Sequence, residues 1–227
     1  MDVKILHGPG NSAARVWINP GECLTAEGGA MISMSGDMGI QTTTLKRGKG
    51  GFLKAVKRML AGENFFLNHY TPGASGGEVL LATTLPGDMM TYDLDNESLI
   101  VQGGSFVACE EQVDVDLSWQ GFKSFLADDS MFWINLKGTG KTVINSFGAI
   151  YPVEVDGEYI VDTGHIVAFN ETLQFSLTKA GGSWATAIFG GEGLVCKFQG
   201  TGTVWCQSHN SNNFGSTLGP MLRARQG

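Results

Sequence analysis

Hydrophobic and polar residues alternate over short stretches along most of this chain, and glycine-containing turns separate the stretches. The clearest example runs from Leu194 to Cys206, on either side of the segment Gly200–Gly202. A period of two residues is typical of a β-strand that buries one face. The pattern therefore predicts an all-β protein built from short strands.

One strand–turn–strand pattern occurs three times without a gap in the alignment. The three copies begin at Glu22, Glu97 and Glu158. Each has an aliphatic residue two positions later and a glycine six positions later, and these turn glycines are Gly28, Gly103 and Gly164. Glycine adopts the positive φ angle that a tight turn requires. We expect one hairpin used three times, in repeats that form one compact body and span 1–85, 86–150 and 151–227.

A second hairpin is expected after each first one. In the third repeat, a loop at Gly200–Gly202 would place Cys196 opposite Cys206. The middle repeat has the same motif at Gly138–Gly140, and the first repeat has a longer turn at Thr71–Gly77. Each repeat is therefore predicted to contain two successive hairpins.

The first repeat contains an insertion, the stretch Leu45–Gly62, which has no counterpart in the other two alignments. Its larger apolar residues have the spacing i, i+1, i+4, i+7 and i+8, and they are Phe52, Leu53, Val56, Met59 and Leu60. This spacing is typical of an amphipathic helix, and Gly62 is a suitable end for it. We expect one inserted helix near residues 50–61, within a helical insertion at 45–62, and no other helix in the chain.

The insertion concentrates positive charge on an acidic protein. It holds six of the 15 basic residues and no acid: Lys46, Arg47, Lys49, Lys54, Lys57 and Arg58. The net charge is −7, so the rest of the chain carries −7 − 6 = −13. One interpretation is a contact with an anionic partner, such as a membrane surface or an acidic protein. The other is that the apolar side packs on the sheet while the lysines keep the opposite side solvated.

Composition and charge argue against several classes of function for this protein. A net charge of −7 argues against a general nucleic-acid-binding protein, because the phosphate backbone favours a basic surface. The first residues do not resemble a secretory signal, and no apolar run is long enough to span a bilayer. We expect a cytoplasmic protein, at most peripheral to a membrane. The four cysteines have no CxxC spacing, so buried, reduced thiols are expected.

No arrangement of residues in the sequence indicates catalysis. The four histidines are scattered, which argues against a metal site, and no G-x-S-x-G nucleophile motif is present. Asp162 and His165 could form a carboxylate–imidazole pair, but their place in the repeat favours a turn. The three repeated glutamates precede strands, and we interpret them as structural. We therefore predict that the protein is not an enzyme and has no cofactor.

Several motifs resemble proteins of the AIM24-like family, named for altered inheritance of mitochondria. The motifs are Gly21–Met31, Gly62–Asn68, Val161–Phe169 and Gly191–Trp205. The resemblance implies a fold similar to that of the tryptophan RNA-binding attenuation protein (TRAP). In such a TRAP-like fold, a short double-stranded β-helix unit would occur three times in this chain. It also implies a homotrimer, with nine units in a ring.

The resemblance supplies no catalytic residues. The function that we expect is a non-enzymatic, ring-forming scaffold or binding protein, with the basic insertion as a contact for a membrane surface. Two alternatives stay open: a ring that binds a small ligand or RNA between units, and an enzyme of unrecognised type. A likeness of fold alone does not decide among them.

Overall fold

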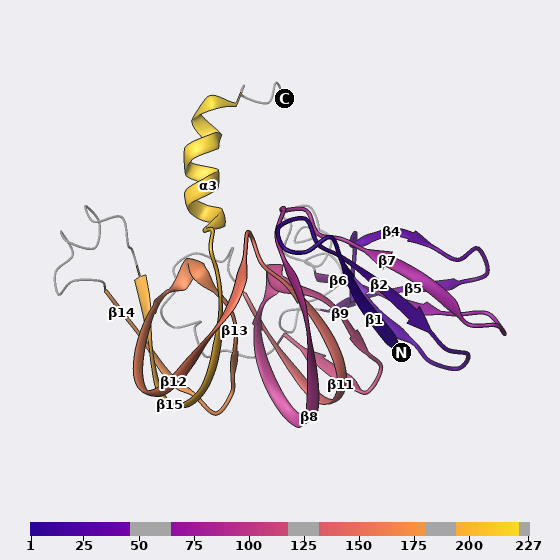
Figure 1. Cartoon of the computed structure of the whole chain (residues 1–227), viewed down its shortest axis with the longest axis horizontal. Helices are drawn as coiled ribbons and strands as arrows, with labels where there is room; N and C mark the ends of the chain where they lie inside the picture. The colour runs from indigo at the N-terminus through magenta and orange to yellow at the C-terminus, as the bar shows by residue number, and fades with distance from the viewer. Residues whose placement is uncertain (46–64, 118–131, 180–193, 223–227) are drawn as a thin grey trace, which may run out of the picture.

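Antiparallel β-strands form most of the described chain, as Figure 1 shows. The computed structural model describes residues 1–45, 65–117, 132–179 and 194–222. The prediction of an all-β protein is confirmed in that the described chain is mostly β, and its named strands pair antiparallel. The helix expected near 50–61 lies outside the described residues. The expectation of no other helix is wrong, because Ser211–Leu218 forms the helix α3.

The strands divide into three groups along the chain. The first group is β1 (Asp2–Leu6), β2 (Ala13–Ile18), β3 (Leu24–Glu27), β4 (Met31–Met34), β5 (Gly39–Leu45), β6 (Phe65–Thr71) and β7 (Gly77–Leu81). The second is β8 (Met89–Gln102), β9 (Phe106–Glu110), β10 (Val113–Asp116) and β11 (Trp133–Asn145). The third is β12 (Ile150–Asp162), β13 (Ile166–Asn170), β14 (Gln174–Lys179) and β15 (Leu194–Gln207).

Each group is organised around a pair of long antiparallel strands. In the second group β8 pairs with β11 along its length, while β10 and β9 pair with successive halves of β11 on its other side. In the third group β12, β15, β14 and β13 have the same pairings. In the first group each long strand is divided in two, so β2 and β3 together pair with β7 and β6.

The glycine motifs in the long strands are bends, and the prediction of hairpin loops there is wrong. β15 continues through Gly200–Gly202 and pairs with β12 from end to end, so Cys196 does not lie opposite Cys206. Gly200, with φ +114°, lies opposite Gly157, with φ +103°. Because both strands have a glycine at this point, they curve together, as Figure 1 shows for β12 and β15.

The expected first hairpins are also absent, because the two strands that flank each turn do not pair with each other. A 3₁₀ turn, η1 (Gly103–Ser105), separates β8 from β9, and η2 (Thr163–His165) separates β12 from β13. After the turn, β9 pairs with β3 of the first group and β13 pairs with β8 of the second. The short strand after each turn therefore joins one group to the preceding one.

A register irregularity recurs at the same place in these joining strands. In β13 it falls between Ile166 and Ala168. In β9 it falls between Phe106 and Ala108, which pair with Ile144 and Val143 of β11. In β4 it falls between Met31 and Ser33. The repeated irregularity gives a residue-by-residue correspondence, in which Ser33, Ala108 and Ala168 are equivalent.

The interior is apolar and continuous across the junctions between groups. Ala168 of β13 and Val101 of β8 lie opposite each other, are fully buried and belong to one hydrophobic cluster. A second cluster in the third group includes Cys196, Phe198 and Cys206. Fully burying a large apolar side chain contributes roughly 1.5–3 kcal/mol, so each junction between groups contributes to stability through side chains as well as hydrogen bonds.

Candidate assembly interface

The joining strand of the first group, β4, is exposed where its counterparts are buried. In β9 and β13, the residues Phe106–Cys109 and Ile166–Phe169 are at most 1% exposed. All four residues of β4 are exposed, and Ile32 exposes 54% of its surface. The difference follows from position, because β9 and β13 each lie against a preceding group and β4 has none in this chain.

The last long strand, β12, has the matching open edge. On β8, Leu99 and Ile100 are 0% exposed because β13 pairs with them. Gln102 and Asp162 are the residues directly before the two 3₁₀ turns. Counted back from them, the equivalents of Leu99 and Ile100 on β12 are Tyr159 and Ile160. These side chains expose 47% and 53% of their surface. Tyr159 and Ile160 thus form an exposed apolar pair on β12, and no following group of strands lies against it.

β4 is an edge of the four-stranded sheet and β12 an edge of the 11-stranded sheet, and Figure 1 shows them on opposite sides of the described chain. They therefore do not pair with each other within one chain. An apolar edge strand with free backbone N–H and C=O groups is a template for pairing with another strand. Within the described residues the chain presents one such edge of each kind, β4 and β12.

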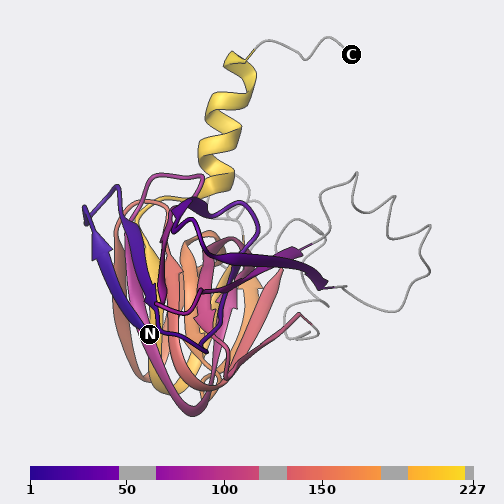
Figure 2. The ribbon, with the colours of Figure 1, turned by 90° about the vertical axis from the view of Figure 1, so that its right-hand side faces the viewer.

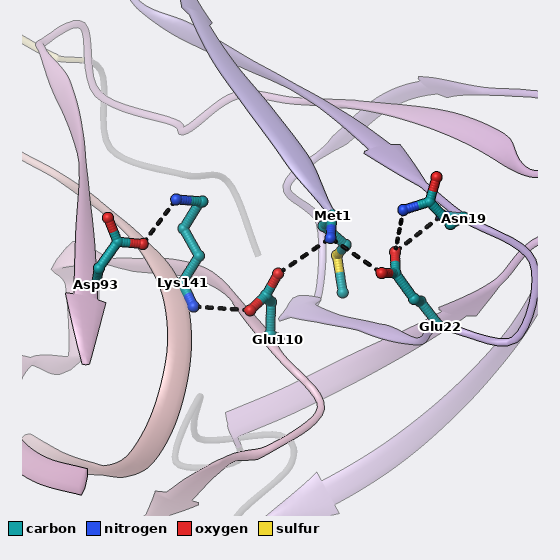
Figure 3. Close-up of polar contacts among 6 residues, drawn as sticks. All are labelled: Met1, Asn19, Glu22, Asp93, Glu110 and Lys141. Carbon is teal, nitrogen blue, oxygen red and sulfur yellow. Dashed lines mark hydrogen bonds and ion pairs between the residues drawn. The ribbon is translucent and has the colours of Figure 1, made fainter. Parts of the chain in front are cut away.

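A polar cluster ties the first group to the second, as Figure 3 shows. The amino group of Met1 lies 3.1 Å from a carboxylate oxygen of Glu22 and 3.3 Å from one of Glu110. The backbone N–H of Lys141 donates to Glu110, and Asn19 donates to Glu22. Burial alone would raise the pKa of Glu22, but the hydrogen bonds from Asn19 and Met1 lower it. Both carboxylates thus have structural partners.

Glu97 and Glu158, the glutamates repeated at the other two positions, also make local contacts. Glu97 accepts a hydrogen bond from the Tyr92 hydroxyl at 3.0 Å. Glu158 accepts from Lys197 at 2.9 Å and from Gln199 at 3.1 Å. The contacts of Glu158 join β12 to the neighbouring strand β15, whereas Glu97 and Tyr92 both lie on β8. The six basic residues predicted as an anionic contact, from Lys46 to Arg58, all lie outside the described residues.

The Asp162–His165 segment forms a turn, as its place in the repeat predicts. Asp162 accepts a hydrogen bond from the backbone N–H of Gly164 at 2.7 Å and so caps η2. Nδ1 of His165 lies 2.8 Å from the backbone oxygen of Gln207. Asp162 thereby stabilises the turn itself, and His165 fixes it against the end of β15. Within the described ranges, no group of three His, Cys, Asp or Glu side chains is arranged to hold a metal ion.

The cysteines are free thiols, and three of them are buried. Burial raises the pKa of Cys109 and of Cys196 to about 12, and that of Cys206 to about 11. These thiols therefore stay protonated at neutral pH and are poor nucleophiles. The prediction of buried, reduced thiols is confirmed for these three, whereas Cys23 is partly exposed.

Comparison with known proteins places the chain in a family. Residues 3–209 match the family described as mitochondrial biogenesis AIM24. The chain belongs to the AIM24 family. The resemblance inferred from the sequence motifs is thereby confirmed over nearly the whole chain.

Other matches to this AIM24 chain come from Streptococcus pyogenes. The chain is 28% identical over 204 residues to the uncharacterized protein M6_Spy0233 of serotype M6, covering 84% of this chain and 82% of the relative. The crystal structure of protein SPYM3_0169 superposes with a TM-score of 0.77 at 24% identity, over 97% of this chain and 99% of that one. This second similarity shows the fold alone. No helix in the described part of the AIM24 chain is long and apolar enough to span a membrane.

The edge residues of this AIM24 protein were not predicted as a site from the sequence. They are Met31, Ile32, Met34, Tyr159 and Ile160. Their apolar runs resemble those of the buried strands β9 and β13, so the local sequence pattern does not predict that these residues are exposed. The order of the repeats does carry a signal, because the first joining strand and the last long strand have no neighbouring repeat within the chain.

Proposed function

We propose that this AIM24 protein is a non-enzymatic scaffold whose copies join head to tail into a closed ring. One observation carries the proposal: β4 and the β12 residues Tyr159 and Ile160 are exposed and largely apolar, while their equivalents inside the chain are buried where β9 pairs with β3 and β13 with β8. In the ring, β4 of one copy pairs with β12 of the next, as β9 pairs with β3 and β13 with β8.

The internal junctions specify the register of this contact. Ala168 lies opposite Val101, and Ala108 lies opposite Ala26. By the correspondence described above, Ser33 of one copy lies opposite Val161 of the next. Met34 then lies opposite Ile160. The contact covers apolar side chains on both strands, each contributing up to roughly 1.5–3 kcal/mol if fully buried.

A ring of three copies is the closed form that fits the family resemblance. A head-to-tail contact closes into a ring or continues as a filament, depending on the rotation between copies. The resemblance implies a homotrimer, in which three chains with three repeats each give nine units in the ring. Closure leaves neither β4 nor β12 unpaired, which removes the open apolar edges.

Light scattering coupled to size exclusion tests the proposal. We expect a mass near three chains for the wild type. Ile160→Arg places a charge in the predicted contact and should give single chains at micromolar concentration. Ile40→Arg is the matched control, since Ile40 is also exposed, at 40%, but lies on β5 outside the contact. A wild-type mass of one chain would refute the ring, as would an Ile160→Arg variant that stays trimeric.

A further inference from the structure

The helix α3 stands apart from the strands. Figures 1 and 2 show it rising from the end of β15 away from the rest of the described chain, and none of its residues is buried. Its start is fixed, because the side chain of Asn210 accepts hydrogen bonds from the backbone N–H groups of Asn212 and Asn213. At its base the ring of Phe214 packs against Phe147, with centroids 5.4 Å apart.

One side of α3 and of the turn after it is apolar and exposed. The turn η3 (Gly219–Met221) follows directly. The apolar residues have the spacing i, i+4, i+7 and i+8, and they are Phe214 (46% exposed), Leu218 (38%), Met221 (76%) and Leu222 (63%). Isolated helices shorter than about 12–15 residues are marginal in water even for strong helix formers. With 8 residues, among them Gly215, α3 needs a cover for this side.

The rest of the helix surface is polar but uncharged. It is made of Ser211, Asn212, Asn213, Ser216 and Thr217. From Phe198 to Leu222 the sequence has no Asp, Glu, Lys or Arg. The side chains of α3 and η3 themselves therefore offer no ion pair to a protein partner. Bulky apolar residues on one side and small uncharged residues on the other are typical of helices that enter defects in lipid packing.

A second copy of α3 is a weaker candidate for the cover. At 1.5 Å per residue the helix is about 12 Å long, and a specific protein contact needs about 1,000 Å² of buried surface. Four side chains on two turns fall well short of that area. A bilayer accepts a single short helix, because its apolar side enters the boundary between headgroups and acyl chains.

We propose that α3 and η3 insert their apolar side into the surface of a lipid bilayer, at sites where lipid packing is loose. The insertion of one helix depends only on the residues of this segment. The strength of binding rests also on the proposed ring, because cyclic symmetry would place all three helices on the same face and add avidity. Binding should therefore favour small, curved vesicles over large, flat ones.

Flotation of the full-length chain with vesicles of neutral phosphatidylcholine tests this proposal. We expect the wild type to float with small vesicles. The double variant Phe214→Ser, Leu218→Ser should bind these vesicles at least roughly tenfold more weakly, because it removes the two large apolar side chains of α3. Met221→Ser, outside α3, should give a partial loss. Ile40→Ser is the control for an exposed apolar residue elsewhere and should float like the wild type.

A further variant separates this surface from the basic insertion. Lys54→Glu, Lys57→Glu, Arg58→Glu should leave binding to neutral vesicles unchanged. The proposal is overturned if the wild type ignores neutral vesicles, or if this charge reversal abolishes their binding. It is also overturned if light scattering gives the Phe214→Ser, Leu218→Ser variant a smaller oligomer mass than the wild type, because α3 would then be a contact between subunits. A wild-type monomer that still floats would refute the ring and leave the lipid contact standing.

Discussion

At the scale of single residues, Glu27 is the clearest departure from ordinary behaviour. It is the last residue of β3, and burial raises its pKa to about 7 from a usual value of 4.5. Its equivalents before the 3₁₀ turns are Gln102 and Asp162, the residues at which η1 and η2 begin. Gln102 carries no carboxyl group, and the carboxylate of Asp162 accepts a hydrogen bond from its turn. Among these three equivalent residues, Glu27 is therefore the one whose carboxyl pKa is raised by burial.

We predict that Glu27→Gln stabilises the protein in a pH-dependent way. Between pH 4.5 and 7 the folded state holds a proton on Glu27 that the unfolded chain releases. The protonated carboxyl therefore contributes stability fully below pH 4.5, and this contribution is lost as the pH rises through 7. Relative to the wild type, the free energy of unfolding of the variant should be higher by up to about 3 kcal/mol at pH 8 and almost unchanged at pH 4.

Urea unfolding at one protein concentration measures this difference. The control Glu171→Gln, at an exposed position, should change stability by no more than about 0.5 kcal/mol at either pH. An equal gain for Glu27→Gln at pH 4 and pH 8 would show that the side chain acts by packing and not by its charge.

The sequence alignment of the repeats places the third copy one residue out of step with the structure. It matches Gly164 to Gly103, an offset of 164 − 103 = 61. The structure matches Thr163 to Gly103, because η2 begins at Thr163 and η1 at Gly103, an offset of 60. The glycine at the start of η1 is not required for the turn, since Thr163 fills the same place. Identity of residue type was therefore a weaker guide than the position of the turn.

At the scale of elements, the bends in the long strands decide how each repeat folds. Gly138 in β11 has φ +135°, and a Cβ atom there would lie 2.3 Å from the backbone oxygen of Gln112. Both the backbone angle and the close approach exclude a larger residue. The same φ requirement would hold in a tight hairpin loop.

Replacing Gly138 by alanine should therefore destabilise the fold by at least about 2 kcal/mol, the sum of a strained backbone angle and a displaced neighbour. Gly104→Ala is the matched control, because no atom lies within 4 Å of its added Cβ, and it should change stability by about 0.5 kcal/mol or less. Thermal or urea unfolding distinguishes the two variants. Similar midpoints for both would mean that β11 does not need its bend.

These bends also explain which elements the sequence predicted correctly. The period-two pattern predicted strands and buried faces, and Cys196, Phe198 and Cys206 do share one apolar cluster. It did not distinguish a hairpin from a bend, because both need glycine at positive φ and the decision comes from pairing with a distant strand. Helix α3 was missed for a local reason: serine, asparagine, threonine and glycine make it a poor helix by propensity.

At the scale of the whole molecule, exposure follows the position of a repeat in the row. β4 and β9 are equivalent strands, yet one is exposed and the other is buried. No residue type explains the contrast, since Ile32 and Met34 are as apolar as Val107 and Cys109. A row of three repeats leaves one half of a junction open at each end, and in the proposed ring the two neighbouring copies cover these halves.

The register of that junction can be tested directly by disulfide cross-linking. Met34→Cys and Ile160→Cys in one chain should place two thiols opposite each other across the contact between copies. Residues directly opposite in antiparallel strands have Cα atoms about 4.5–5.5 Å apart, a range that a disulfide spans. With the partly exposed Cys23 replaced by serine in every variant, oxidation should link chains up to three per ring on a non-reducing gel.

The pair Ile40→Cys with Ile160→Cys is the control, because Ile40 lies on β5 and should not meet Ile160 of another copy. Linkage by this pair at the same rate would indicate random collision. Bands beyond three chains would indicate that the head-to-tail contact forms but does not close, which corresponds to a filament. If the oligomer forms and the Met34–Ile160 pair stays reduced, the copies meet through a different surface, and the apolar edges of β4 and β12 need another cover.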